Sequence, residues 1–168
     1  MRALSAKRSW RARPGSGTVA EIFFYHLLGQ RLEAVLPRLL DKSRERGWRA
    51  LVRVATDERL AAVDDHLWTY ADDSFLPHGT DREADPHEHP LLLTTGDANR
   101  NRADILFLVE GAPVPADISG YLRVMYLLDG SDEDAVSHGR QVYRSLREAG
   151  HELSYWQQDD EGRWAKRG

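Results

Sequence analysis

The stretch DILFLV, residues 104–109, indicates the fold of this chain. After the Asp, five apolar residues follow one another with no polar residue at alternate positions. A strand covered on both faces has this pattern, whereas a strand with one face in water alternates between apolar and polar residues. LLLTT, residues 91–95, is a second run of this kind. Two such runs predict a sheet with other elements packed on both of its sides.

Around these runs, segments typical of strands alternate with segments typical of helices. Further strands are expected at residues 21–26, 49–55 and 121–128, with an edge strand at 151–156. Helices are expected from Arg31 to near Gly47, from Asp57 to about Tyr70 and from Ser131 to Ala149. Pro37 either kinks the first helix or delays its start, Thr56 caps the second, and Gly150 closes the third. This alternation predicts a three-layer α/β fold with a largely parallel, twisted sheet flanked by helices.

The composition is that of one soluble domain. A chain of 168 residues can bury one sizeable core, and no apolar run in it is long enough to span a bilayer. The absence of Cys excludes disulfides and thiolate chemistry and points to a reducing cytoplasm. We expect a basic extension over residues 1–18, a single α/β domain over 19–158 and a charged tail over 159–168.

Positive charge is concentrated at the start of the chain. The net charge is −4, but residues 1–13 hold five cations and no acid, which leaves −9 on the remaining residues. A body this acidic repels phosphate backbones, so direct nucleic-acid binding by the folded part is not expected. The basic segment and the PGSGT that follows it are a disordered tail, a linker, or residues upstream of a true start near Val19. Direct DNA binding through residues 1–13 is a separate possibility.

Motifs for nucleotide, metal or triad chemistry are weak. The turn after the first strand, HLLGQR, holds only Gly29, so it lacks the glycines and the GK[ST] of a phosphate loop. Glu110 imitates the acid that ends a Walker B strand, but no phosphate loop accompanies it. His87 and His89 lie two residues apart in a loop without a third fixed ligand, which favours a solvated loop. A nucleotide- or metal-dependent enzyme on the same sheet is the alternative hypothesis.

The last expected helix has two different faces on a helical projection. Ala135, Val142, Leu146 and Ala149 cluster on the side expected to meet the sheet. Almost opposite lies a basic strip with one aromatic residue, made of Val136, Arg140, Tyr143, Arg144 and Arg147. This strip is either a solvated face with Tyr143 covered by arginine stems, or a site for an acidic peptide.

The loop after the second expected helix is unusually apolar. LWTYADDSFLPHGT, residues 67–80, places Phe75, Leu76, Pro77 and His78 where a solvated connection is expected. Such a loop either packs back onto the core or meets a partner. Trp68 lies about a quarter-turn off the buried side of its helix and is either half-buried packing or a partly exposed anchor.

Three blocks carry a resemblance to a known family. They are LWTYADDSFLPHG at 67–79, PLLLTTGDANRNRADILFLV at 90–109 and R-x-x-Y-x-x-x-x-x-A-G over 140–150. Together they resemble the χ (chi) subunit of bacterial DNA polymerase III holoenzyme, from about Ala20 to Gln157. The resemblance implies a small nucleotide-binding-like fold without a phosphate loop, no cofactor and no catalytic activity. It also implies two partners, the ψ (psi) subunit of the clamp-loader complex and the acidic C-terminal tail of single-stranded DNA-binding protein.

The resemblance also implies roles for particular residues. Arg140 and Tyr143 match the family's tail-binding Arg and aromatic residue, and Trp68 matches a Trp near that site. The ψ-facing loop corresponds to Phe75, Leu76, Pro77 and His78. Where relatives carry a Lys one turn before the Arg, this chain has Val136, so Arg144 or Arg147 has to supply the missing charge. Many bacteria lack a recognisable ψ, so the second partner is ψ or another clamp-loader component.

Overall fold

The computed structural model of the chain describes residues 21–70, 76–159 and 161–167. In chain order the elements are β1 (Glu21–Leu27), α2 (Leu32–Glu45), β2 (Ala50–Arg53), α3 (Asp57–Thr69), β3 (Gly79–Thr80), the 3-10 helix η1 (Pro86–Glu88), β4 (Leu91–Thr94), β5 (Ile105–Val109), β6 (Arg123–Asp129), α4 (Glu133–Glu148), β7 (Glu152–Gln158) and β8 (Trp164–Lys166). Within these ranges, no helix combines the length and the apolar character that crossing a membrane requires.

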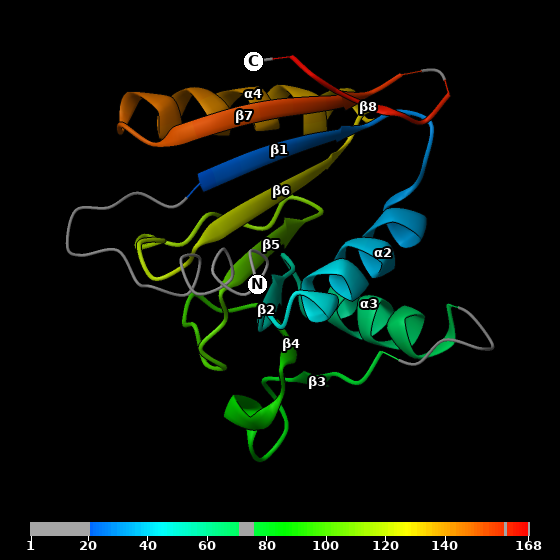
Figure 1. Cartoon of the computed structure of the whole chain (residues 1–168), viewed down its shortest axis with the longest axis vertical. Coiled ribbons are helices and arrows are strands. Elements are labelled where there is room, and N and C mark those ends of the chain that lie inside the picture. Colours follow the sequence, from blue (N-terminus) through cyan, green and yellow to red (C-terminus); the bar gives the residue numbers. More distant parts are fainter. Residues whose placement is uncertain (1–20, 71–75, 160, 168) are drawn as a thin grey trace, which may run out of the picture.

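The strands form one sheet in the order β3-β4-β2-β5-β6-β1-β7-β8 (Figure 1). Every neighbouring pair is parallel except β7 and β8, which are antiparallel. The apolar run at residues 104–109 forms β5 inside the sheet, where all five of its side chains are buried. The α/β fold with a largely parallel sheet is therefore confirmed.

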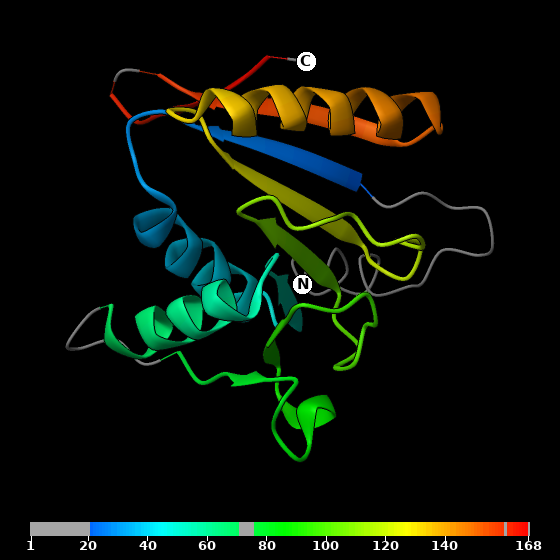
Figure 2. The same ribbon diagram turned by 180° about the vertical axis from the view of Figure 1, so that it is seen from behind.

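The two faces of the sheet carry separate cores. α2 and α3 pack on one face, with Phe107 of β5 in that core. α4 packs on the other face, with Leu106 of β5 in its core. Successive residues of a strand point to opposite faces, so one apolar run serves both layers. Figure 1 shows β7 crossing in front of α4, and Figure 2 shows the helix from its outer side, in front of β7.

The helix ends follow the local signals in the sequence. The Thr56 hydroxyl accepts a hydrogen bond from the Arg59 amide at 3.2 Å and so caps α3 as expected. α2 begins at Leu32 and runs through Pro37. Gly47 and Gly150 have positive φ angles of 75° and 91° just beyond α2 and α4, which is the conformation that ends a helix most easily at glycine.

The C-terminal part of the fold differs from the expectation. β7 is flanked by β1 and β8, so it is an interior strand and β8 forms the edge. The tail expected over 159–168 therefore contains a short strand. Trp164 anchors it, because its ring packs edge-on against Tyr25 with a centroid distance of 4.8 Å. A strand of three residues is too short to produce a period-2 pattern, and only the tertiary contact identifies it.

Candidate functional site

The helix α4 is capped at its start and packs closely on the sheet at its middle. The Asp132 side chain accepts hydrogen bonds from the amides of Asp134 and Ala135 at 3.0 and 3.3 Å. In the middle of the helix, a Cβ atom added to Gly139 would lie 2.8 Å from a methyl group of Leu128. The helix therefore presents one defined face to the sheet.

The packed face of α4 agrees only in part with the helical projection, because Val142 and Leu146 pack against the core as expected. The residues that contact the core or are buried are Val136, Gly139, Val142, Tyr143 and Leu146. Ala149, expected to be buried, is exposed, and Val136 and Tyr143, expected on the outer strip, pack inward. The centre of the packed face is Gly139, which has no side chain and so carries no weight in a hydrophobic pattern.

Tyr143 is a structural part of this interface. Its ring meets the ring of Phe24 on β1 at a centroid distance of 5.2 Å and the ring of Tyr155 on β7 at 5.8 Å. Both contacts are edge-to-face, an arrangement that aromatic pairs prefer. The side chain is nevertheless only half-buried, so part of it lies at the border between the core and the outer face of α4.

Arg140 lies beside this aromatic group and acts on it electrostatically. Burial lowers the pKa of His26, and the positive charge of Arg140 lowers it further. The same charge lowers the pKa of Tyr155, although burial outweighs it and the net shift is upward. The Nδ1 atom of His26 and the Tyr155 hydroxyl lie 2.8 Å apart, within hydrogen-bond distance. The charge of Arg140 thus acts on a polar pair formed by residues of β1 and β7.

Three arginine side chains of α4 are available to a ligand. Arg140, Arg144 and Arg147 are exposed. Among the described residues, no carboxylate lies within ion-pair distance of these three guanidinium groups. Five residues of the candidate site therefore come together on one helix, with Val136 and Tyr143 at the packed border and the three arginines outside it.

Trp68 does not belong to this group. It lies on α3, which covers the opposite face of the sheet from α4. Its side chain is 47% exposed, and its ring centroid is 4.2 Å from that of His78. The expectation that Trp68 borders the site on α4 is therefore wrong, because sequence position gives no information about which face of the sheet a helix covers.

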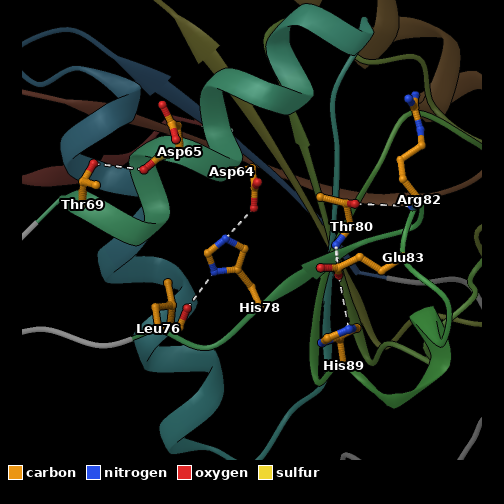
Figure 3. Close-up of polar contacts among 9 residues, drawn as sticks. All are labelled: Asp64, Asp65, Thr69, Leu76, His78, Thr80, Arg82, Glu83 and His89. Carbon is orange, nitrogen blue, oxygen red and sulfur yellow. Dashed lines mark hydrogen bonds and ion pairs between the residues drawn. The ribbon is translucent and has the colours of Figure 1, made fainter.

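The segment that follows α3 packs back onto the domain. Leu76 is 1% exposed and belongs to the core under α2 and α3. The imidazole of His78 is buried between two oxygen atoms, with Nε2 2.8 Å from a carboxylate oxygen of Asp64 and Nδ1 2.7 Å from the Leu76 carbonyl (Figure 3). Four residues were assigned to a partner-facing loop. Leu76 and His78 are buried, Pro77 is half-buried, and Phe75 lies outside the described residues.

The neighbouring histidine loop is built around a contact between an imidazole and a carboxylate. The Nε2 atom of His89 lies 3.3 Å from the carboxylate of Glu83, which also accepts a hydrogen bond from the Thr80 amide at 2.9 Å (Figure 3). His87 is exposed. No group of three or more potential metal ligands occurs within residues 21–70, 76–159 and 161–167.

An open crevice of about 800 Å³ lies beyond the carboxyl ends of β1 and β6. In parallel sheets this is where ligands often bind. The start of α4 at this crevice carries Asp132 and Asp134, which oppose the phosphate that a helix N-terminus otherwise attracts. Glu110 has a φ angle of 53°, and its carboxylate is held 2.7 Å from Arg59. Glu110, which resembled the acid at the end of a Walker B strand, is therefore engaged in an ion pair with Arg59.

Fold and surface together define a class, which is a largely parallel α/β protein with no phosphate loop after its first strand and with three exposed arginines on its outer helix α4. The sequence profile of the family described as DNA polymerase III chi subunit, HolC, matches residues 19–154. The chain belongs to the DNA polymerase III chi subunit family.

Two curated relatives carry the same family name. The probable DNA polymerase III subunit chi of Rickettsia prowazekii (strain Madrid E) is 25% identical over 100 residues, which cover 60% of this chain and 58% of the relative. The DNA polymerase III subunit chi of Pseudomonas aeruginosa (strain PAO1) is 26% identical over 117 residues, which cover 69% of this chain and 79% of the relative. The chain thus matches less than two thirds of the Rickettsia protein.

Proposed function

We propose that this chain is a non-catalytic accessory subunit of the DNA polymerase III holoenzyme, associated with its clamp loader. In this role it captures the acidic C-terminal tail of single-stranded DNA-binding protein through α4, and so links the polymerase to protein-coated single strands. The observation that carries the proposal is the set of three exposed arginines on α4, which have no ion-pair partner among the described residues.

The chemistry of α4 suits an acidic tail. Guanidinium groups bind carboxylates through two parallel hydrogen bonds, and these charge-assisted bonds are stronger than neutral ones. Arg140, Arg144 and Arg147 supply such groups, and the half-buried Tyr143 and Val136 supply an apolar border for an aromatic residue at the end of the tail. Arg144 or Arg147 supplies the charge of the Lys that relatives carry at the position of Val136.

A second surface, around Trp68, is proposed for ψ or another clamp-loader component. Trp is a common anchor at protein interfaces because it buries a large area with few rotatable bonds. Trp68 is half exposed, lies next to the buried His78, and is on the opposite face of the sheet from α4. Two partners could therefore bind at the same time. Leu76 and His78 hold this surface in shape, and Pro77 adds to its rim.

A peptide titration tests the tail site. A labelled peptide with the acidic, aromatic-ended sequence of the cognate tail is titrated with the wild-type chain, Arg140→Ala and Arg38→Ala. Arg38 is the matched control, because it is exposed on α2 on the other side of the sheet. Loss of one charge-assisted contact weakens binding by about ten- to a hundredfold, so only Arg140→Ala should show this loss. Equal affinities for all three chains would refute the tail site.

The enzyme alternative has less support. Its nucleotide would have to place phosphates at the acidic start of α4, and its catalytic acid Glu110 is engaged by Arg59. A ligand that binds only the native state raises the melting temperature. ATP with a divalent ion at millimolar concentration is therefore expected to leave the melting temperature unchanged, and a rise would revive this alternative.

A further inference from the structure

Aromatic side chains line the sheet face opposite α4, over the half of the sheet formed by β6, β1, β7 and β8. Phe23 and Tyr25 of β1 point to this face and pack at the edge of the α2–α3 core. Trp156 of β7 is the direct neighbour of Tyr25 in the parallel register, so it points to the same face. Trp164 of β8 adds a fourth ring against Tyr25. In Figure 1 this half of the sheet is seen from the side away from α4, with β7 in front of that helix and α2 to the right of the strands.

A pocket of about 230 Å³ opens on this face between the sheet and the end of α2. Its walls include the rings of Tyr25, Trp48 and Trp156 and the cationic side chains of Lys42, Arg46 and Arg123. No acidic side chain is among the residues that line it. The crevice beyond β1 and β6 has the opposite net charge, because five acids and only two arginines line it. On a body with a charge of −9, this pocket is a local cationic and aromatic site.

The cations of the pocket lie close to the rings. The guanidinium carbon of Arg46 is 5.1 Å from the centroid of Trp48, and that of Arg123 is 4.4 Å from the centroid of Phe23. Lys166 of β8 is the register partner of Trp156, so it extends the positive rim to the edge of the sheet. Acids stand at the two ends of this face: Glu21, which lies 4.0 Å from Arg123 and pairs in register with Glu152, at one end, and Asp129 of β6 at the other.

We propose that this face binds single-stranded nucleic acid, with bases against the rings of Trp156 and Tyr25 and phosphates on Lys42, Arg46, Arg123 and Lys166. Proteins that bind single strands without sequence preference combine these two elements, aromatic rings that stack on bases and cations that follow the backbone. A duplex is not suited, because its bases are already stacked on one another and are not free to stack on protein side chains. An acidic peptide ending in one aromatic residue would use one ring, whereas β1, β7 and β8 bring several rings to this face and Trp48, beyond the end of α2, adds another.

The expectation that the folded part avoids nucleic acid rested on its total charge. The structure separates that charge into an acidic crevice and a cationic face, and a ligand responds to the local potential. The five cations of residues 1–13 precede the first described residue, Glu21, so the experiment has to measure their contribution separately. The proposal is independent of tail capture by α4, which covers the other side of the sheet.

A binding experiment with the full chain tests this face. The probe is a fluorescent oligothymidylate of about 15 nucleotides, at about 50 mM salt, followed by anisotropy and by quenching of tryptophan emission. The test variants are Trp156→Ala and the exposed pair Lys42→Ala with Arg46→Ala. The matched controls are Trp68→Ala on α3 and Arg140→Ala on α4, which remove a ring and a charge elsewhere. Circular dichroism and urea unfolding confirm that each variant is folded.

The proposal predicts a specific pattern of losses. Trp156→Ala should weaken binding by roughly 5- to 100-fold, the effect of losing one stacked base. The double Lys42 and Arg46 variant should reduce the slope of log affinity against log salt by about 1.4, since each phosphate contact on a single strand contributes about 0.7. Both controls should bind like the wild type, and a duplex of the same length should bind more weakly.

Several results would overturn it. These are no measurable binding of the oligonucleotide by the full chain, equal binding by all variants, or loss of binding in Arg140→Ala alone. A chain lacking residues 1–18 separates the contribution of the basic start. If this deletion abolishes binding while Trp156→Ala has no effect, the nucleic acid contacts that segment and not the sheet. If an acidic peptide binds in an Arg46-dependent way and the oligonucleotide does not, the face is a peptide site.

Discussion

The ring of Tyr143 on α4 packs edge-on against the ring of Phe24 on β1, with 5.2 Å between the centroids. A residue assigned to ligand binding by resemblance is therefore also part of the core beneath the helix. Any binding experiment on this residue has to separate the two roles. The hydroxyl and the ring can be removed in turn, which gives the first prediction.

Tyr143→Phe should keep the packing and change the free energy of unfolding by less than about 0.5 kcal/mol. Tyr143→Ala should lower it by about 2 kcal/mol, because a half-buried aromatic ring is lost and its cavity only partly collapses. Urea unfolding measures both values. If Tyr143→Ala is as stable as the wild type, the ring does not support α4, and its role lies entirely in binding.

Arg140→Ala should raise the pKa of His26 towards its ordinary value of 6.5, because the positive charge of Arg140 is one of two causes that lower it. Burial is the larger cause, so a downward shift should remain. An NMR titration of the His26 ring measures this pKa. An unchanged value would show that Arg140 is too far from His26, or too well screened, to act on it.

The same histidine makes stability depend on pH. Because the folded-state pKa of His26 is lowered, the unfolded chain binds more protons between that pKa and about 6.5. The free energy of unfolding contributed by this group is therefore fully present above pH 6.5 and decreases as the pH falls through the folded pKa. His26→Gln should flatten this part of the stability curve, as urea midpoints at a series of pH values would show.

Gly130→Ala should destabilise the protein strongly. A Cβ atom at this position would overlap the carbonyl oxygen of Leu27 and the ring of His26, and the backbone oxygen cannot move aside. We expect a loss of about 3 kcal/mol, at the upper end of overpacking effects. Gly29→Ala is the matched control, since nothing lies within 4 Å of the added atom, and it should be within about 0.5 kcal/mol of the wild type. Similar melting temperatures for the two variants would contradict this close approach.

His78→Ala should cost about 3 kcal/mol of stability, because it leaves the carboxylate of Asp64 and the carbonyl of Leu76 without their buried partner. His87→Ala, in an exposed position, is the control and should change stability by less than about 0.5 kcal/mol. A double-mutant cycle with Asp64→Asn measures the coupling between His78 and Asp64. A coupling energy of zero would mean that this hydrogen bond does not hold the segment.

Much of the fold could be predicted because its signals are local. The run at 104–109 is apolar on both faces, and β5 is buried on both sides. Thr56 caps α3 through its own side chain. The strand at 164–166 could not be predicted, because three residues show no period and the strand exists through pairing with β7 and through the contact of Trp164 with Tyr25.

The candidate site could be predicted only in part, because a site depends on which elements come together. Arg140, Arg144 and Arg147 share one helix, so their spacing in the sequence was enough to predict that they lie close together on its surface. Trp68 was assigned to the same site by resemblance, but it lies across the sheet. No local pattern indicates which face a helix covers, since that follows from the handedness and direction of each crossover.

By itself, the sequence determined the longer elements, the Thr56 cap, the glycine-terminated helix ends and the family, because these follow from short-range periodicity, local side chains and motif similarity. Tertiary structure alone decided which residues share a surface. It placed Gly139 at the centre of the packed face of α4, buried Leu76 and His78 within the domain, and divided the charge between an acidic crevice and a cationic aromatic face. The physical reason is that surfaces and local potentials are made by residues distant in sequence, whose positions are set only when the strands are ordered in the sheet.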